Sequence, residues 1–253
     1  TIENVGLFEL SPFSKYEIKG EKAYEELQRL CTANIKNEIG KCTYTHMLNE
    51  GAGIETDLTV VCLEKNHFRI ISSAAVRTHD KAHILKHLSK DLEFKDVTDD
   101  IICLGIFGPK SRDLLSKITE EDITNENFKF GTSKNIKLDS INIWVQRLSY
   151  VGELGYELYI PTKDAKEIYN LIINTGKQFR LSNCGAHAMD TMRMESGFLH
   201  WGHDISPEEN QYQAGLNFTI SYKKPFDFIG KEKLLKIRDQ KLDRRFVMLV
   251  LKD

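Results

Sequence analysis

The chain has 253 residues, of which 41% are hydrophobic and 28% are charged, so it can bury a core in one large domain or two smaller ones. Its 35 Lys and Arg residues nearly balance 37 Asp and Glu residues, which argues against a nucleic-acid partner. No apolar run reaches the roughly 18 residues of a membrane-spanning helix, and the N-terminus lacks a secretory pattern. We therefore expect a soluble chain with no membrane partner.

The five cysteines are scattered, odd in number and never spaced as a CxxC pair. This usage fits buried thiols in a reducing compartment, the cytoplasm or the mitochondrial matrix, and disfavours cysteine-bound zinc. The chain begins with Thr1 and ends in an apolar, strand-like run at residues 246–253. We therefore expect a piece of a longer polypeptide.

One strand-turn-helix pattern occurs twice. Residues 15–20 alternate as a strand does and end at Gly20, after which apolar residues recur at helical spacing. The same order returns at residues 101–108, where the strand ends at Gly108 and a helix with apolar residues up to Ile118 follows. These copies predict an internal duplication, with a fainter third copy at residues 228–237.

The remaining pattern favours an α+β fold. Strands come in antiparallel-looking pairs separated by helices, which differs from a regular βαβ winding. The glycines at 51 and 53 lack the third glycine of the dinucleotide fingerprint and lead into a strand, so a Rossmann fold is disfavoured. We expect one continuous unit over residues 1–253, with approximate halves 1–100 and 101–253. The further predicted strands are residues 42–48, 59–63, 68–72, 141–148 and 157–160, and the further helices are residues 78–88, 163–179 and 186–195.

Two glycine-rich stretches carry candidate functional residues. Residues 51–61 place Asp57 where a glycine-rich loop enters an apolar strand, and small residues there let a ligand approach the backbone. Residues 149–157 combine two glycines, two tyrosines and two acids, a set that suits a flat, nitrogen-rich ring. Each stretch also has a purely structural interpretation, a surface turn with solvated acids for the first and a hairpin for the second.

A third stretch spans residues 184–204. Within it, Asp190 and Arg193 are helical neighbours that can form a structural pair, while Glu195 lies near the helix end, where the dipole disfavours negative charge. Three histidines, at positions 79, 83 and 87, share one helical face. Lysines crowd that segment, so we interpret it as a solvated face and predict no metal site.

Taken in order, six segments resemble the folate-binding aminomethyltransferase family, which includes the T-protein of glycine cleavage. The sequence at residues 75–80, 149–157 and 201–205 is more similar to one branch of the family, the dimethylglycine and sarcosine dehydrogenases, in which a flavin domain precedes the folate-binding domain. The six segments are Val-Gly-Leu-Phe-Glu-Leu-Ser (5–11), Tyr-Thr-His-Met-Leu-Asn (44–49), Gly-Ile-Glu-Thr-Asp-Leu-Thr-Val (53–60), residues 149–161, Met-Asp-Thr-Met-Arg-Met-Glu-Ser-Gly (189–197) and Asp-Phe-Ile-Gly (227–230).

The resemblance implies duplicated, interleaved α/β half-domains around a central folate funnel, with the family's C-terminal barrel absent from this chain. It also implies tetrahydrofolate as the cofactor. Flavin adenine dinucleotide is implied only if a flavin domain precedes Thr1, because nothing in these residues indicates flavin oxidation.

The resemblance implies roles for individual residues at the positions that match the family's motifs. Asp57 matches an acid near the reacting folate nitrogens and is the implied catalytic residue, although Thr56 stands where the family has a second acid. Glu195 matches an acid that clamps the pterin, since a carboxylate accepts two parallel hydrogen bonds from such a ring. The other implied folate-binding residues are Tyr44, Asn49, Tyr150, Glu153 and Tyr156.

The function implied by the resemblance is transfer of an amine-derived one-carbon unit to tetrahydrofolate, forming 5,10-methylenetetrahydrofolate, as part of a dimethylglycine or sarcosine dehydrogenase-like enzyme. The expected partners are folate, the amine-derived unit, and either a covalently linked flavin domain or a lipoyl carrier protein. Two alternatives remain open: a stand-alone aminomethyltransferase of the glycine cleavage system, and a folate-binding protein without transfer chemistry.

Overall fold

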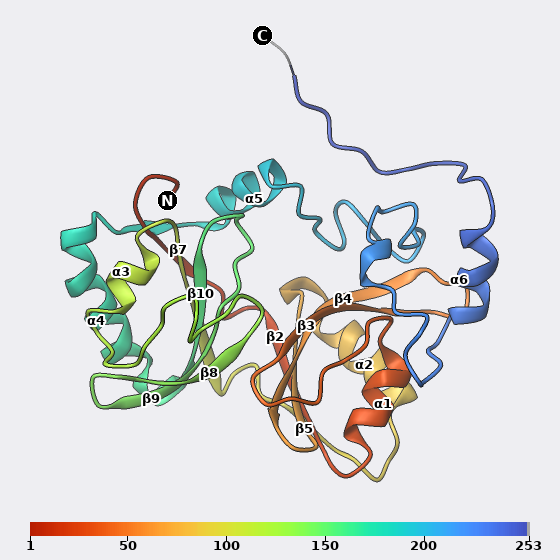
Figure 1. Ribbon diagram of the computed structural model, residues 1–253, viewed down its shortest axis with the longest axis horizontal. Coiled ribbons are helices and arrows are strands. Elements are labelled where there is room, and N and C mark those ends of the chain that lie inside the picture. The colour runs from red at the N-terminus through yellow and green to blue at the C-terminus, as the bar shows by residue number, and fades with distance from the viewer. Residues whose placement is uncertain (252–253) are drawn as a thin grey trace. The chain divides into compact units, whose positions relative to one another are not determined.

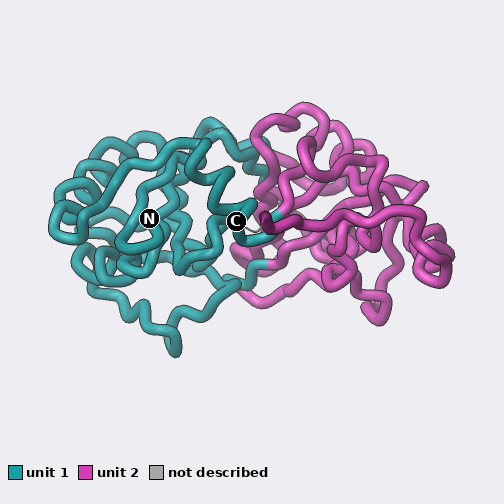
Figure 2. Tube along the Cα trace, turned by 90° about the horizontal axis from the view of Figure 1, so that it is seen from above, with its two compact units in different colours: residues 1–16, 40–42, 96–198 teal, residues 17–39, 43–95, 199–253 magenta. Residues whose placement is uncertain are grey.

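The computed structural model describes residues 1–251 and divides into two compact units (Figure 2). Unit 1 comprises residues 1–16, 40–42 and 96–198, whereas unit 2 comprises residues 17–39, 43–95 and the chain from 199 onward. Each unit combines a β-sheet with helices, and the units interleave along the sequence. The predicted α+β class with interleaved half-domains is therefore confirmed, and neither sheet closes into a barrel within the described residues.

Unit 1 is built on a six-stranded sheet with strand order β11-β1-β7-β10-β9-β8. Neighbouring strands run antiparallel except for β1 and β11, which are parallel. The strands are β1 (Gly6–Glu9), β7 (Ile101–Phe107), β8 (Ser133–Leu138), β9 (Ile141–Gln146), β10 (Gly155–Pro161) and β11 (Ser182–Cys184), and the helices are α3 (Ser111–Leu115), α4 (Ala165–Gly176) and α5 (Ala186–Glu195).

The core of unit 1 follows from the alternation of β10, in which Tyr156, Leu158 and Ile160 are buried on one face of the sheet. Ile168 and Ile172 of α4 lie one helical turn apart and pack into the same cluster. Figure 1 shows α3 and α4 covering this face. The helical face of the sheet is therefore a packed core rather than a ligand cavity.

A five-stranded sheet with strand order β3-β4-β5-β2-β6 forms the main layer of unit 2. Helices α1 and α2 contact β5 and β4 respectively (Figure 1). A second cluster packs Leu48, Ile54, Trp201 and Phe228 around Leu234. The strands are β2 (Ser14–Lys19), β3 (Cys42–Leu48), β4 (Ile54–Glu64), β5 (His67–Ser72) and β6 (Glu93–Asp96), and the helices are α1 (Ala23–Leu30), α2 (Arg77–His87) and α6 (Lys231–Arg238).

Short 3₁₀ turns flank α2 and α4, at Ala74–Val76, Thr162–Asp164 and Lys177–Phe179, and a further one lies at Asn217–Thr219. The long helix predicted over residues 163–179 is therefore α4 with one 3₁₀ turn at each end. No helix in residues 1–251 is both long enough and apolar enough to cross a bilayer.

The repeated strand-turn-helix pattern is confirmed at its two stronger copies. Gly20 and Gly108 both have positive φ, 143° and 125°, and precede α1 and α3. For the third copy the predicted strand is wrong, because no strand leads into Gly230. The predicted helix is present as α6, which begins at the next residue. In the second copy Ile118 lies beyond the end of the short α3.

Four short strands were not predicted, namely β1, β6, β8 and β11. They have three to six residues, and β6 contains no fully buried side chain. Conversely, the apolar run expected to be a strand near the C-terminus forms no regular element over residues 246–251, where its side chains are exposed. Residues 252–253 lie outside the described part.

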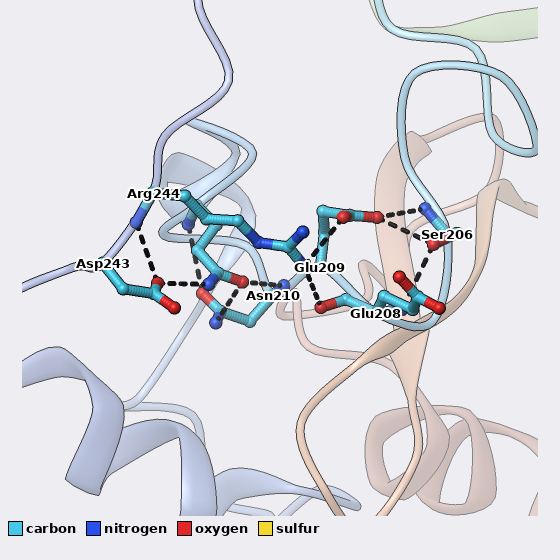
Figure 3. A network of polar contacts seen from close by, with 7 residues as sticks. Ser206, Glu208, Glu209, Asn210, Asp243 and Arg244 are labelled. Atoms are coloured by element: carbon cyan, nitrogen blue, oxygen red, sulfur yellow. Dashed lines mark hydrogen bonds and ion pairs between the residues drawn. The ribbon is translucent and has the colours of Figure 1, made fainter.

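The segment before that run is held to the loop that begins at Ser206 by polar contacts within unit 2 (Figure 3). Arg244 Nη2 lies 3.0 Å from Glu209 Oε1, and the Glu209 carboxylate accepts hydrogen bonds from both the backbone N–H and the hydroxyl of Ser206. Gln213 donates to Asp243 at 2.9 Å. These contacts fix the chain as far as Phe246, whose N–H donates to the carbonyl of Gln213.

Candidate active site

Asp57 lies near the middle of β4, and its carboxyl is half-buried. Its neighbours in sequence, Thr56 and Leu58, are buried on the opposite face of the strand. Burial raises the pKa of Asp57 to about 7, and the negative charge of Asp80 on α2 adds to this effect. Near neutral pH the carboxyl therefore populates both its charged and its neutral form, which suits a group that moves protons.

Tyr44 brings a hydroxyl to the Asp57 carboxyl. It lies on β3, the neighbour of β4, and its Oη is 3.4 Å from Asp57 Oδ2. The side chain is 40% exposed, so the pair is open to a ligand. Of the residues implied by the resemblance, Tyr44 and Asp57 are thus brought together by the structure of unit 2.

His46, two residues after Tyr44, extends this contact inward. Its Nε2 lies 3.3 Å from Tyr44 Oη, and its Nδ1 lies 3.0 Å from Thr219 Oγ1. The ring is fully buried, and burial lowers its pKa to about 3, so the imidazole is neutral. Sequence analysis did not select His46, although its spacing from Tyr44 places both side chains on the same face of β3.

Three side chains, Glu55 of β4 and His79 and Asp80 of α2, link the strand to the helix. His79 places Nδ1 3.1 Å from Asp80 Oδ1 and Nε2 3.1 Å from Glu55 Oε2. The His79 ring also stacks on Trp201, with 5.6 Å between ring centroids. Asp80 is fully buried, which raises the pKa of its carboxyl. These contacts hold in place the acid whose charge contributes to the raised pKa of Asp57.

The histidine face of α2 has other contacts. The rings of His83 and His87 lie 5.0 Å apart, while His79 contacts Glu55 and Asp80. Within residues 1–251 there is no group of three or more His, Cys, Asp or Glu side chains that could hold a metal ion.

Asn49 organises the turn that leads into β4. Its Oδ1 accepts a hydrogen bond from the N–H of Gly53 at 3.0 Å, and its Nδ2 donates to Glu55 Oε1 at 2.8 Å. Ala52 has a positive φ of 68° in the same turn. Both polar ends of the Asn49 side chain are engaged inside the turn, so the geometry gives it a positioning role rather than a ligand contact.

Four of the implied residues, Tyr150, Glu153, Tyr156 and Glu195, belong to unit 1. Tyr150 stacks on Phe198, with 6.1 Å between ring centroids. Ser196, next to Glu195, donates to the carbonyl of Val151 at 3.4 Å. The exposed end of α5 that carries Glu195 therefore lies against the loop that carries Tyr150.

Glu153 contributes to a cavity of about 350 Å³ in unit 1. The cavity walls come from the same loop and from the end of β9, including Arg147 and Ser149. Phe130, which is 74% exposed, also lines the cavity. A carboxylate, a guanidinium and an aromatic ring thus converge within one unit.

Tyr156 does not fit the role that the resemblance implies for it. Its side chain is fully buried in the core of unit 1, where its ring lies 5.7 Å from that of Phe128. Its hydroxyl accepts a hydrogen bond from Arg112 Nε at 3.0 Å and contacts the carbonyl of Ile123. The alternation of β10 turns Tyr156 toward α3 and α4, so the geometry gives it a packing role.

Two further features were missed by sequence analysis. Glu157, adjacent to Tyr156, points to the other face of β10, and burial raises its pKa to about 7. It accepts a hydrogen bond from the Tyr159 hydroxyl at 2.8 Å.

A cavity of about 510 Å³ lies between α6 and residues 240–245 in unit 2, and none of the implied folate residues lines it.

The family of the chain follows from its match to a model described as "GCVT N-terminal domain", which covers residues 1–224. The chain belongs to this family. The predicted aminomethyltransferase resemblance is therefore confirmed, and this GCVT-family chain is an aminomethyltransferase-like domain related to dimethylglycine and sarcosine dehydrogenases.

Curated relatives agree with this assignment. The domain is 39% identical to 4-methylaminobutanoate oxidase (formaldehyde-forming) of Paenarthrobacter nicotinovorans, over 99% of this chain and 31% of the relative. It is 36% identical to human mitochondrial dimethylglycine dehydrogenase, over 99% of this chain and 29% of that protein. It is 31% identical to an aminomethyltransferase of Alkaliphilus metalliredigens, over 99% of this chain and 68% of the relative. The domain thus spans about three-tenths of the length of the dehydrogenase and oxidase relatives.

Solved structures support the same fold. The crystal structure of glycine cleavage system aminomethyltransferase T from Bartonella henselae matches with a TM-score of 0.83 and 24% identity, covering 93% of this chain and 63% of that one. At this level of identity the match establishes the fold alone. The GCVT-family domain therefore has the T-protein architecture.

Proposed function

We propose that this GCVT-family domain transfers a one-carbon unit from an oxidised methylamine to tetrahydrofolate, forming 5,10-methylenetetrahydrofolate. The observation that carries the proposal is the Asp57 carboxyl, half-buried beside Tyr44 with a pKa raised to about 7. The motif that contains Asp57 and the family membership support tetrahydrofolate as the acceptor.

The chemistry requires proton transfer near neutral pH. A bond forms between the methylene carbon and a folate nitrogen, the bond from that carbon to the amine breaks, and its electron pair leaves with the amine nitrogen. Since the product carries the methylene carbon on both N5 and N10, a second bond to folate forms as the second bond of that carbon to the oxidised amine breaks. The two folate nitrogens together lose two protons and the amine nitrogen gains two, so the transfer is redox-neutral. As a carboxylate Asp57 accepts a proton from a folate nitrogen, and as an acid it delivers a proton to the leaving amine nitrogen.

The residues present fit a reduced pterin. Such a ring offers N–H donors to a carboxylate and a flat face to an aromatic side chain. In unit 2 Asp57 and Tyr44 supply an acid beside an exposed aromatic ring. In unit 1 we propose that the exposed Glu195 and the neighbouring Tyr150 and Glu153 also contact folate, which remains a prediction to be tested by mutation.

The source of the one-carbon unit belongs to the proposal. Relatives named as dehydrogenases and oxidases oxidise amines, and we propose that a flavin-containing domain or partner supplies the oxidised amine here. The relative named as a formaldehyde-forming oxidase suggests that a one-carbon unit that folate does not capture is released as formaldehyde. Exclusion of water by the folate-binding domain would divert that unit from formaldehyde to folate. Because human and rodent relatives are mitochondrial, a mitochondrial matrix location belongs to the same proposal.

The stand-alone aminomethyltransferase is the second candidate. It is favoured by the Alkaliphilus metalliredigens relative, of which the domain covers 68%. In that case the one-carbon unit would arrive on a lipoyl carrier protein. Supplying the enzyme with either an oxidisable methylamine or an aminomethyl-loaded lipoyl carrier distinguishes the two donors.

The proposal is tested by titrating the natural full-length protein with tetrahydrofolate, followed by fluorescence, with unreduced folate as the control ligand. Asp57→Asn should retain tetrahydrofolate binding but slow methylene capture by about a hundredfold, because a positioned acid-base group contributes about that much. Asp113→Asn, which changes an exposed acid of unit 1, should leave both unchanged. Equal capture by the Asp57→Asn variant would remove Asp57 from the transfer step, and tetrahydrofolate binding without capture by the unsubstituted protein would leave only a folate-binding protein without transfer chemistry.

A further inference from the structure

The Tyr44 hydroxyl lies between two groups that can each accept its hydrogen. It is 3.4 Å from Asp57 Oδ2 and 3.3 Å from His46 Nε2. A phenolic hydroxyl carries one hydrogen, so it can donate to only one of these groups at a time. The identity of the acceptor therefore depends on which nitrogen of His46 carries a hydrogen.

Thr219 settles this point. Its hydroxyl donates to the carbonyl of Leu216 at 2.7 Å, so toward His46 Nδ1, at 3.0 Å, Thr219 Oγ1 can only accept. Nδ1 consequently carries the hydrogen. Because the buried imidazole is neutral, its other nitrogen, Nε2, is an acceptor.

Gln211 is compatible with this assignment. Its Nε2 donates to Thr219 Oγ1 at 2.7 Å and to Thr32 Oγ1 at 3.0 Å, which uses both amide hydrogens. In this orientation, however, the Gln211 amide nitrogen and the Nδ1–H of His46 are both donors and face each other at 3.0 Å, which favours the amide in its turned-over orientation. With the amide turned over, its oxygen accepts the Nδ1 hydrogen, which agrees with the contact to Thr219 and leaves Nε2 of His46 as the acceptor.

We propose that His46 is a positioning residue for Asp57: by accepting the Tyr44 hydrogen it turns the lone pairs of the Tyr44 oxygen toward Asp57 and lets that carboxyl keep its proton. When Asp57 is charged, the Tyr44 hydroxyl donates to the carboxylate instead, and Nε2 of His46 loses its donor. The hydroxyl thus exchanges partners as Asp57 gains and loses its proton. This inference rests on the proposed function, in which both forms of Asp57 act.

Among the described residues, titratable groups from β3 and α2 act on the pKa of Asp57. Tyr44 faces it from β3, and Asp80 acts on it from α2. Asp80 and His46 favour the same protonated state of Asp57, Asp80 through its charge and His46 through the Tyr44 hydroxyl. Only the effect of His46 requires that hydroxyl, and this difference makes the inference testable.

Two substitutions separate the two ends of the imidazole. In His46→Asn the short amide reaches the position of Nδ1, so the contact with Thr219 is kept and the acceptor for Tyr44 is lost. In His46→Gln the longer amide reaches the position of Nε2 and restores an acceptor for Tyr44. We expect His46→Asn to lower the pKa of Asp57 by about one unit and His46→Gln to leave it nearly unchanged.

The pKa is read from the carboxylic-acid C=O band in infrared difference spectra between each protein and its Asp57→Asn counterpart across a pH series. This readout uses the natural full-length protein and needs no turnover. It therefore separates failure of the inference from failure of the proposed function. If Asp57 titrates at the same pH in His46→Asn as in the unsubstituted protein, His46 has no positioning role.

A double-substitution cycle supplies the second readout, the acidic limb of the pH profile of kcat/KM for methylene transfer. We expect His46→Asn to move this limb to lower pH by about one unit in the natural protein and to move it no further in the Tyr44→Phe background. Equal shifts in both backgrounds would show that His46 acts on the enzyme through the packing of unit 2, and would overturn the inference.

Discussion

Lys22 and Lys110 adopt almost the same backbone conformation, φ −93° and ψ 3° for the first and φ −93° and ψ 5° for the second. Each follows a glycine of positive φ by two residues, and in both copies the carbonyl of that glycine accepts a hydrogen bond from the N–H three residues later. The same turn thus ends a strand and starts a helix once in each unit. This local identity is the structural basis of the duplication.

The first prediction concerns Gly108. A Cβ at this position would lie 2.5 Å from the carbonyl oxygen of Asn4 and 2.6 Å from that of Thr1, and φ is +125°. Because both obstacles are backbone atoms, we expect Gly108→Ala to lower the free energy of unfolding by about 3 kcal/mol or more. Urea denaturation measures this change.

Gly131→Ala is the matched control. Gly131 also has a positive φ, +71°, but nothing lies within 4 Å of an added Cβ. The expected loss is about 1 kcal/mol, the ordinary cost of a left-handed conformation for alanine. Similar losses for the two variants would mean that φ alone, and not the close approach of the N-terminal backbone, requires Gly108.

The second prediction is that Asp57→Asn stabilises the protein at pH 8. The pKa of Asp57 is raised from 3.8 to about 7, so the folded state binds more protons between these values and stability falls as pH rises through them. We expect a gain of about 1–3 kcal/mol at pH 8 that disappears near pH 4. Thermal unfolding at the two pH values measures it.

Asp122→Asn provides a control of opposite sign. Hydrogen bonds from Thr124 and Asn127 lower the pKa of Asp122, so its charged form is favoured in the folded state. The substitution should therefore reduce stability at pH 8 rather than increase it. A loss for both variants at pH 8 would contradict the raised pKa of Asp57.

Elements with a strong local signal were predicted well. The helix expected over residues 186–195 is α5, with the same bounds, and the strand expected over residues 42–48 is β3. The three-residue β11 could not be found in this way, because it exists only by pairing with β1, about 176 positions earlier. A short edge strand has too few alternating side chains to be told from a loop.

The third prediction concerns Lys224, which is buried although charged. Its ammonium donates to the carbonyls of Gln28, Cys31 and Ala33 at and beyond the end of α1 and lies over the ring of Phe228. We expect Lys224→Met to lower the free energy of unfolding by about 2–4 kcal/mol, because three buried carbonyls lose their donor. Chemical denaturation gives the value.

The adjacent Lys223 is exposed and serves as the control. Lys223→Met should change stability by no more than about 0.5 kcal/mol. If Lys224→Met were equally neutral, the three carbonyls would have to find other donors, and the lysine would not be needed to end α1.

Part of the candidate site could be predicted from the sequence and part could not. Asp57 and Tyr44 carry recognisable motifs on neighbouring strands, and the structure places their polar atoms 3.4 Å apart. The role of His46 depends on Thr219, which is 173 positions away in the sequence. Tyr156 is the opposite case. Its position in a motif predicted a ligand contact, but the alternation of the strand buries its side chain. Long-range contacts and burial decide these cases.

The fourth prediction concerns the anchor of β4, the strand that carries Asp57. Trp201 is almost fully buried, and its Nε1 donates to the carbonyl of Ile54 at 2.8 Å. Trp201→Phe keeps most of the apolar surface but leaves that carbonyl without its donor, so we expect a loss of about 1–3 kcal/mol in the free energy of unfolding. Trp144→Phe is the matched control, because the buried Nε1 of Trp144 has no hydrogen-bond partner in the described residues. Equal losses for the two variants would assign the effect to ring volume, and the hydrogen bond to Ile54 would then contribute nothing to holding β4 in place.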